Sequence, residues 1–342
     1  MHLKKGEDSM FSKNRLDEIE KQLASLKNKI DNITVPESGK IEKQLDDLRD
    51  EVHHLKIGFD DYQKNMNIRI WHMNASNDKL FARLELERAD LYTGGGNTNR
   101  LLQLKDSHRG EKCFIIGNGP SLTTEDLDIL CRNNVTCFAC NKIALIYNYT
   151  QWRPDYYFCS DPMYYDFKSI DEQEQDLTLR LFPVDVIDGL SKKDTASCFY
   201  PLIRRYMLTP EFGYNICGGV YEGGSVVYQE IQMAVYMGFT EIYLLGVDNS
   251  FHYKELPDGR LGIDLSVQSH FYAEDSESKE VEEQLNGWVD YGNPISAGLY
   301  LPDDGYRAAK WHCDNKGIKI LNATRGGKLE IFPRVNFDEY FG

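Results

Sequence analysis

The 342-residue chain contains no apolar run that approaches the roughly eighteen residues of a membrane-spanning helix, so no transmembrane segment is expected. Its first residues are polar and lack the apolar centre of a signal peptide, which predicts a cytoplasmic protein. Basic residues are fewer than acidic ones: the chain has 39 Lys and Arg and 54 Asp and Glu, which gives a net charge of −15. This balance argues against a nucleic-acid-binding protein that works by neutralising phosphates.

Several familiar site motifs are also missing. Cys137 and Cys140 form a C-x-x-C without a second pair at zinc spacing, and the eight cysteines are scattered, so we expect buried reduced thiols. No D-x-D motif, the metal–nucleotide clamp of many glycosyltransferases, accompanies the predicted strands. No lysine follows the glycine-rich segment 218–225 in the manner of a Walker A motif, which excludes a P-loop.

The most informative segment that is present follows the apolar run 113–116. Gly117, Asn118, Gly119, Pro120 and Ser121 come directly after this run. A strand that ends in glycines and turns into a helix leaves backbone N–H groups available, and α/β folds receive phosphates and nucleotides at such turns. The amide between the glycines can both donate and accept hydrogen bonds. The segment therefore predicts a nucleotide site, with a tight turn that binds no ligand as the alternative.

Residues 12–92 carry an apolar repeat at alternating steps of three and four. The repeat comprises Leu16, Ile19, Leu23, Leu26, Ile30 and Ile33, and then Ile41, Leu45, Leu48, Val52, Leu55, Phe59, Tyr62 and Met66. This spacing predicts an N-terminal α-helical coiled coil that joins copies of the chain into a homo-oligomer. An amphipathic helix packed on its own domain is the alternative. Three glycines at 94–96 mark a joint, so we expect a helical oligomerisation region at 1–92, a linker at 93–111 and a catalytic domain at 112–342.

Strand-like and helix-like segments alternate beyond the joint. Strands are predicted at 113–116, 135–139, 156–159, 181–186, 242–245 and 318–321, and helices at 124–132, 225–237 and 304–315. Apolar strands separated by helices indicate an α/β fold with a Rossmann-like, mostly parallel sheet covered by helices on both faces. Ligands bind at the carboxyl ends of such strands, where four of these segments end in small or polar residues.

Polar residues at these strand ends are the first site candidates. Asn118 and Asn141 follow two strands and could read a base, a ribose or a phosphate, or satisfy local turns. Asp161 and Asp248 follow two others and could bind Mg²⁺, a ribose hydroxyl or a substrate proton, or cap helices.

Further candidates come from loops. Gly224 and Ser225 could hold a phosphate at a helix N-terminus, or the serine could only be the N-cap. His270, in a polar segment with Glu274 nearby, suits a general base. Tyr253 could contact a phosphate or pack in its loop. Arg325 and Lys328 follow the last strand and could offer positive charge to an anion, or form a solvated turn.

Five motifs together resemble a known family. They are G-N-G-P-S-L at 117–122, A-C-N at 139–141, M-G-F-T-E-I-Y-L-L-G-V-D at 237–248, S-H-F-Y at 269–272 and N-A-T-x-G-G-K-L-E at 322–330. The chain from about 112 to 340 is similar to the 6-hydroxymethylpterin diphosphokinase MptE-like domain, which also occurs in the Maf proteins that glycosylate flagellin. It is more distantly similar to bacterial sialyltransferases of the Campylobacter type.

The similarity to the sialyltransferases implies that Asn118 and Asn141 contact a CMP-sugar, that Tyr253 binds its phosphate and that no metal is needed. The chain departs from their pattern at two positions. Asp161 replaces an asparagine that contacts the sugar donor, and Glu274 stands where these enzymes have the histidine that acts as the catalytic base. Both His270 and Glu274 therefore remain candidates for the base.

The diphosphokinase that names the domain implies instead that ATP and Mg²⁺ are used, with Asp161 and Asp248 as metal ligands. We expect a glycosyltransferase-like enzyme that transfers a sugar, here a CMP-linked nonulosonate, to a hydroxyl acceptor in bacterial surface glycan or flagellin modification. The diphosphokinase and a non-catalytic coiled-coil scaffold are the alternatives. The sequence leaves open whether an inner-membrane glycan assembly complex recruits the protein.

Overall fold

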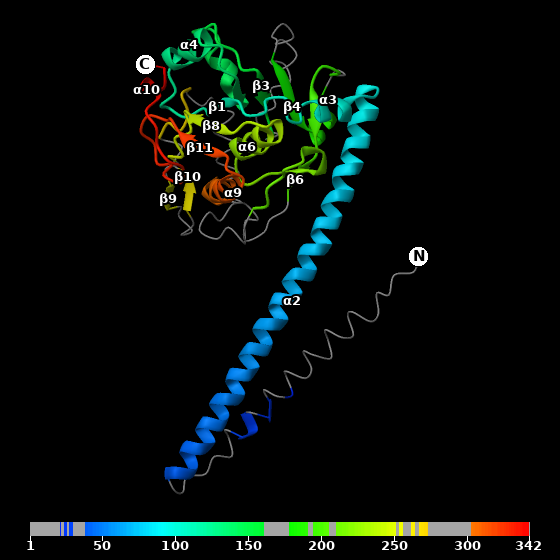
Figure 1. The fold of residues 1–342 in the computed structure, drawn as a ribbon, viewed down its shortest axis with the longest axis vertical. Helices are drawn as coiled ribbons and strands as arrows, with labels where there is room; N and C mark the ends of the chain where they lie inside the picture. The colour runs from blue at the N-terminus through cyan, green and yellow to red at the C-terminus, as the bar shows by residue number, and fades with distance from the viewer. Residues whose placement is uncertain are drawn as a thin grey trace. The chain divides into compact units, whose positions relative to one another are not determined.

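The computed structural model describes residues 21, 24–25, 27–29, 38–160, 178–190, 194–204, 210–250, 253–255, 261–263, 267–272 and 302–341. The chain divides into two compact units, Met1–Ser76 and Asn77–Gly342. Figure 1 shows the ribbon, with its elements labelled. Within the described residues, no helix is both long and apolar enough to cross a membrane.

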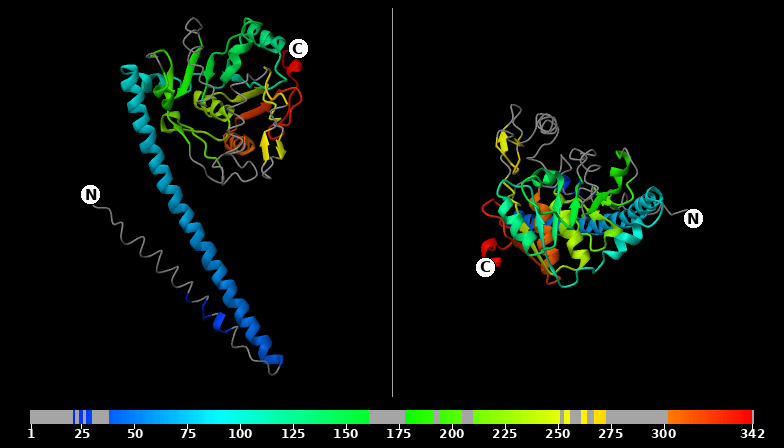
Figure 2. Two further views of the ribbon diagram at one scale, coloured as in Figure 1. Left: turned by 180° about the vertical axis from the view of Figure 1, so that it is seen from behind. Right: turned by 90° about the horizontal axis from the view of Figure 1, so that it is seen from above.

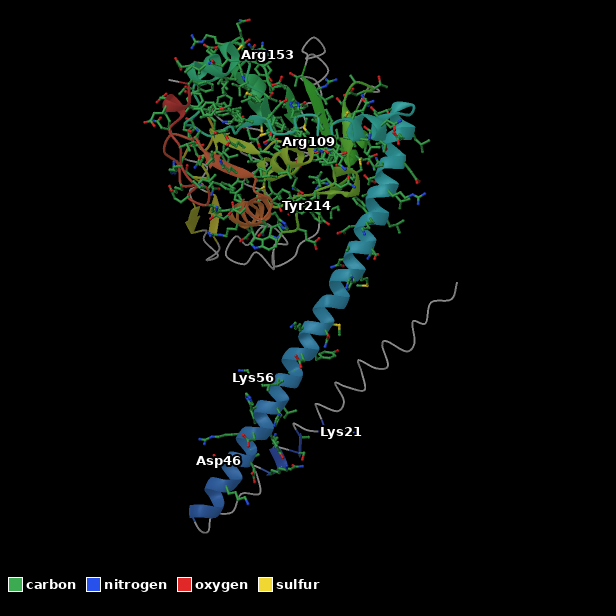
Figure 3. All side chains as sticks on the ribbon, in the orientation of Figure 1. Lys21, Asp46, Lys56, Arg109, Arg153 and Tyr214 are labelled. Atoms are coloured by element: carbon green, nitrogen blue, oxygen red, sulfur yellow. The ribbon has the colours of Figure 1, made fainter. Side chains whose placement is uncertain are left out.

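The described residues of the first unit are helical, as the apolar repeat predicts. Helix α2 (Ser38–Thr93) has 56 residues and continues into the second unit. Lys29 Nζ lies 2.7 Å from Glu51 Oε1 of this helix. Figure 3 draws the side chains along α2, with Asp46 and Lys56 labelled. Pairing of the helical region between chains stays a prediction.

The second unit is built on a seven-stranded sheet in the order β11-β8-β1-β2-β3-β4-β5. Its strands are β1 (Lys112–Ile116), β2 (Cys137–Cys140), β3 (Tyr156–Phe158), β4 (Leu179–Pro183), β5 (Cys198–Tyr200), β8 (Glu241–Leu245) and β11 (Lys319–Asn322). Every pair of neighbours is parallel. The predicted α/β fold with a parallel sheet is therefore confirmed.

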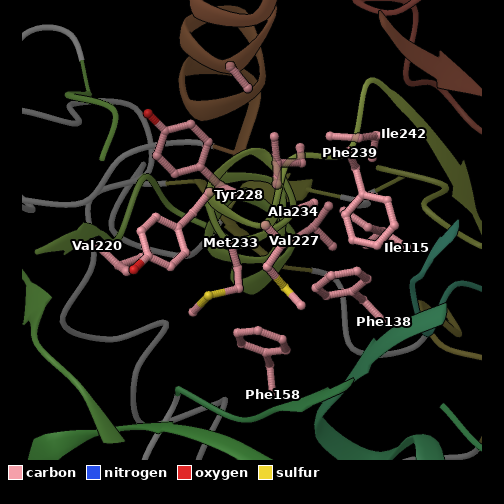
Figure 4. Packing of buried hydrophobic residues seen from close by; sticks show 14 of the residues in the cluster. Ile115, Phe138, Phe158, Val220, Val227, Tyr228, Met233, Ala234, Phe239 and Ile242 are labelled. Carbon is pink, nitrogen blue, oxygen red and sulfur yellow. The ribbon is translucent and has the colours of Figure 1, made fainter. Parts of the chain in front are cut away.

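Successive residues of each strand lie on opposite faces of the sheet. Ile115 of β1 lies in one buried cluster with residues of α6 (Val226–Met237) and α9 (Pro302–Asp314), and Figure 4 shows part of this cluster. Phe114 lies in the other cluster, with residues of α4 (Thr124–Arg132) and α10 (Phe337–Tyr340). Helices thus cover both faces, as the further views in Figure 2 show.

The segment 93–111, predicted as a linker, contains α3 (Asn97–Gln103), whose Asn97 and Leu101 are buried. The Asn97 amide donates to the carbonyl of Phe199 in β5 at 2.8 Å and accepts from its N–H at 2.7 Å. The cysteines are all free thiols. Burial raises the pKa of Cys137 and of Cys140.

The predicted strand 181–186 is partly wrong. Strand β4 ends at Pro183, and the 3-10 helix η3 (Val184–Asp188) follows, since proline lacks the N–H that would continue the ladder. The shorter elements were not predicted, because segments of six residues or fewer carry too little periodicity. They are β5, α10, η1 (Asn141–Ile146), η4 (Ile216–Gly218), β6 (Leu202–Ile203), β7 (Val220–Tyr221), β9 (Tyr253–Glu255) and β10 (Leu261–Ile263).

Candidate functional site

The turns after β1 and β8 meet at the carboxyl edge of the sheet. The chain runs from β1 through β2 to β5 on one side and returns with β8 on the other side of β1. The N–H of Gly117 donates to the carbonyl of Leu245, and that of Gly119 to Gly246, each at 2.8 Å. Such a reversal of strand order is where open α/β sheets bind ligands.

The glycines of the first turn are required by its contact with the second turn. A Cβ atom on Gly117 would lie 2.5 Å from the carbonyl oxygen of Gly246, and one on Gly119 would collide with the carboxylate of Asp248. The close approach of the two turns therefore explains the glycines at 117 and 119. This explanation does not require the third glycine of a dinucleotide-binding fingerprint.

Asn118 and Asn141 present unpaired acceptors at the ends of the neighbouring strands β1 and β2. The Asn118 Nδ2 donates to the carbonyl of Cys140 at 3.0 Å. Because that carbonyl can only accept, this bond fixes which end of the amide is the oxygen. The Oδ1 atoms of Asn118 and Asn141 are both buried and have no hydrogen-bond partner among the described residues. A buried acceptor without a donor is costly, so these two atoms mark a place for a ligand that carries donors.

Asp248 and Ser121 join the two turns. The Ser121 Oγ donates to Asp248 Oδ2 at 2.7 Å, and the Ser121 N–H lies 3.4 Å from the same oxygen. Asp248 is 7% exposed. Burial raises the pKa of its carboxyl, and the hydrogen bonds from Ser121 oppose this shift.

The loop after β11 closes on Asp248 from the other side. The N–H of Lys328 donates to the carbonyl of Asp248 at 2.7 Å. Arg334, which the sequence analysis missed, donates to the carbonyls of Thr324 at 3.2 Å, Gly326 at 2.6 Å and Gly327 at 3.3 Å. Arg334 thus stabilises the conformation of the loop 324–327. The sequence does not reveal this role, because the partners of Arg334 lie seven to ten residues before it.

The two basic candidates of this loop differ in their surroundings. The Arg325 guanidinium pairs with Asp126 and lies 2.5 Å from Asp338, so two carboxylates already compensate its charge. Lys328 is exposed. The Arg325 charge is therefore already partnered within the protein.

The segment of His270 lies against the first turn. The N–H of Phe271 donates to the carbonyl of Asn118 at 2.8 Å. The His270 ring stacks on Tyr272 with centroids 4.9 Å apart, and the Lys142 Nζ lies 5.6 Å from the Tyr272 ring. A backbone bond thus brings one candidate base beside Asn118, while the other, Glu274, lies outside the described residues.

The remaining candidates have local roles or fall outside the description. Ser225 is the N-cap of α6, since its Oγ accepts from the N–H of Val227 at 3.2 Å, and the Tyr306 hydroxyl lies 3.2 Å from the same oxygen. Gly224 has a φ of 77° in the turn before it. Tyr253 begins β9, and its side chain is not described; Asp161 lies outside the described residues.

Glu230 of α6 is a further polar residue that the sequence analysis missed. It is 0% exposed, and neither carboxyl oxygen has a partner among the described residues. Burial raises the pKa of Glu230 well above its usual range, because it disfavours the charged form of the carboxyl. Its neighbour Gln229, in contrast, donates to Ser160 Oγ at 3.0 Å and accepts from the Tyr200 hydroxyl at 2.8 Å. The only signal in the sequence is a carboxyl within the apolar helix 226–237.

No curated protein sequence matches the chain. The structure is similar to a Maf glycosyltransferase from Magnetospirillum magneticum AMB-1, with a TM-score of 0.39 and 14% identity, over 68% of this chain and 35% of that one. The chain thus spans about a third of that protein's length. Residues 89–254 match the family model described as 6-hydroxymethylpterin diphosphokinase MptE-like, and they include the motifs at 117–122, 139–141 and 237–248. The matched family is the one that the motifs predicted.

Proposed function

We propose that the second unit is a glycosyltransferase-like enzyme, which transfers a nonulosonate from a CMP-linked donor to a hydroxyl acceptor in bacterial surface glycan or flagellin modification. The observation that carries the proposal concerns the Oδ1 atoms of Asn118 and Asn141 at adjoining strand ends: both are buried, and neither has a partner among the described residues.

These two atoms favour a nucleoside as the ligand. At neutral pH, phosphodiester oxygens only accept hydrogen bonds, so they cannot satisfy an amide oxygen. A nucleoside carries donors, namely the ribose hydroxyls and, in cytidine, an exocyclic amine. The phosphate would lie at the backbone N–H groups of the first turn or at the N-terminus of α6, where Ser225 and Gly224 lie. Tyr253 and Lys328 are further candidates for its oxygens.

The chemistry needs one base. The acceptor hydroxyl gives its proton to His270 or Glu274 while its oxygen forms a bond to the anomeric carbon of the sugar. The bond from that carbon to the phosphate oxygen breaks, and CMP leaves with the electron pair. The hydrogen bond from Phe271 to Asn118 supports His270, because it brings the histidine segment to the turn that would hold the donor.

A thermal-shift titration with CMP, CDP, UDP, GDP and ATP, each with and without Mg²⁺, tests the proposal. We expect CMP and CDP to stabilise the protein without metal. Asn141→Ala should weaken CMP binding about tenfold or more, since it removes one acceptor for a ligand donor. The exposed Asn133→Ala, at the C-terminus of α4, should bind as the wild type does. Stabilisation by UDP or GDP alone would contradict the CMP assignment.

The diphosphokinase remains the second candidate, because the family description names that activity and Asp248 stands at the reversal of strand order. Asp161, the other expected Mg²⁺ ligand, is not described, and the described residues hold no group of three or more His, Cys, Asp or Glu that could bind a metal. Mg²⁺-dependent stabilisation by ATP would favour this candidate. A protein that no nucleotide stabilises would favour the scaffold.

A further inference from the structure

The buried carboxyl of Glu230 is a polar group that the fold itself does not satisfy. Neither Oε1 nor Oε2 meets a hydrogen-bond donor among the described residues. Whether it is ionised or protonated, a carboxyl has at least one oxygen that can only accept hydrogen bonds. A buried acceptor without a donor costs free energy. At least one Glu230 oxygen therefore needs a donor that the described part of the protein does not supply.

Glu230 lies in the second turn of α6, toward the end of the helix that is near the candidate site. Helix α6 packs on β1 and β2, ends at Met237 and is followed closely by β8, which begins at Glu241. Because β8 begins at the amino edge of the parallel sheet, the N-terminus of α6 lies at the carboxyl edge. Long side chains in helices point back toward the helix N-terminus. The Glu230 carboxyl is therefore directed toward the edge where the candidate site lies.

Cys140, the last residue of β2, is one neighbour of this carboxyl. Burial raises the pKa of the Cys140 thiol, and the charge of Glu230 raises it further. Because such an effect weakens with distance, the carboxyl and the thiol lie close together. The carbonyl of Cys140 accepts from Asn118 Nδ2 at 3.0 Å, and Asn141 is the next residue in the chain. The carboxyl thus lies beside the residue that joins the two candidate asparagines.

The hydroxyl of Tyr306 is a second neighbour. Burial raises the pKa of this hydroxyl, its hydrogen bond with Ser225 lowers it, and Glu230 is among the groups that raise it further. The Tyr306 oxygen lies 3.2 Å from the Oγ of Ser225, the N-cap of α6. The Glu230 carboxyl therefore lies near the polar ends of β1 and β2 and near the turn before α6, the places that the proposed function assigns to the nucleotide.

We propose that Glu230 binds the 2′- and 3′-hydroxyls of the ribose, so that the candidate site selects ribonucleotides over 2′-deoxyribonucleotides. This inference rests on the nucleotide site of the proposed function, but not on the identity of the base. The two ribose hydroxyls are neighbouring donors, and the two oxygens of a carboxyl are neighbouring acceptors. An acidic residue accepts from the ribose in the same way in Rossmann folds that bind NAD. The Oδ1 atoms of Asn118 and Asn141 then remain for donors of the base, such as the exocyclic amine of cytosine.

Calorimetric titration of the full chain with CMP and with 2′-deoxy-CMP tests this proposal. The wild type should bind CMP about tenfold more tightly, because only CMP supplies the 2′-hydroxyl to the buried carboxyl. Glu230→Leu should bind both nucleotides equally, with an affinity near that of the wild type for 2′-deoxy-CMP. Glu87→Leu, at an exposed position of α2, is the matched control and should keep the preference.

Thermal melting should show that Glu230→Leu folds, since leucine replaces a buried polar group that has no partner among the described residues. Glu230→Gln is a second, conservative variant. Its amide oxygen still accepts from one hydroxyl, so this variant should keep part of the preference for CMP.

Equal binding of CMP and 2′-deoxy-CMP by the wild type overturns the inference about Glu230 and leaves the proposed function in place. A folded Glu230→Leu that keeps the preference for CMP does the same. If ATP binds and CMP does not, the proposed function is wrong, and the comparison of ATP with 2′-deoxy-ATP decides the role of Glu230 by the same criteria. If no nucleotide binds, both are wrong.

Discussion

Buried asparagines show at the residue scale what distinguishes the candidate site. Asn97 and Asn322 each use both ends of the amide: Asn322 Nδ2 donates to the carbonyl of Leu329 at 2.8 Å, and its Oδ1 accepts from the N–H of Thr324 at 3.0 Å. Asn118 uses only its Nδ2, and its Oδ1 has no partner among the described residues. A buried asparagine thus has a structural role where both ends of its amide are hydrogen-bonded. It is a candidate for ligand binding where one end has no partner.

Glu230→Gln should stabilise the protein increasingly as pH rises. The unfolded carboxyl loses its proton above about pH 4.3, whereas the folded one keeps it, because burial raises its pKa. The stability from this group is therefore present below that pH and is lost as pH rises toward the folded pKa, by up to about 1.4 kcal/mol per pH unit. Glutamine has the same shape and no proton to lose. Urea unfolding from pH 5 to 8 measures the difference, and a gap that does not widen contradicts the assignment.

Gly119→Ala should cost about 1–3 kcal/mol of stability, since the added Cβ would collide with the Asp248 carboxylate. Gly58→Ala is the matched control, because a Cβ at Gly58 meets nothing within 4 Å and the residue lies within α2. This control should stabilise the helix by about 0.5–1 kcal/mol. Chemical denaturation compares the two. Equal effects would mean that the two turns do not touch as described.

Among the elements, α3 ties the start of the domain to the edge of the sheet. Strand β5 is at the edge of the sheet and has no neighbouring strand on its outer side. There the Asn97 side chain forms hydrogen bonds with the N–H and the carbonyl of Phe199. Arg100 of the same helix donates to the carbonyls of Thr195 and Ser197, each at 2.8 Å. The segment 93–111 therefore carries structural contacts where the glycine run predicted a flexible joint.

Asn97→Ala should lower the free energy of unfolding by about 2–4 kcal/mol, because it leaves the N–H and the carbonyl of Phe199 without partners. Asn99→Ala, an exposed position on the same helix, should change it by less than about 0.5 kcal/mol. Guanidinium unfolding followed by circular dichroism gives both values. If both variants lower the free energy of unfolding equally, the loss comes from the helix propensity of α3 and not from the hydrogen bonds to β5.

For the whole molecule, the helical region that is expected to pair between chains and the candidate site lie on different elements, α2 and the strands β1, β2 and β8. Leu84→Glu/Leu91→Glu should therefore shift the oligomeric state and leave the thermal shift produced by a saturating nucleotide within about 1 °C of the wild-type value, because neither leucine lies at the ends of β1, β2 or β8. Thermal shift at matched nucleotide concentrations tests this. Loss of the nucleotide response in the folded variant would mean that the two functions are coupled.

The sequence by itself determined the strands of the sheet except β5, because their signals are local. Apolar runs ending in polar residues predicted β1 and β8, and the helix predicted at 225–237 is α6, with Ser225 as its N-cap. The family could also be predicted, since its motifs are short and contiguous. The short strands β5, β6 and β7 could not, because their pairing depends on partners elsewhere in the chain.

Only the tertiary structure decided which candidate residues meet. The order of the sheet places β8 beside β1, so Ser121 bonds to Asp248 across 127 positions of sequence. It also engages Arg325 with Asp126 and Asp338, and it leaves the Oδ1 atoms of Asn118 and Asn141 without a donor among the described residues. A side chain's hydrogen-bond partners are set by which strands lie side by side, and that adjacency arises from packing both faces of the sheet, which no local pattern encodes.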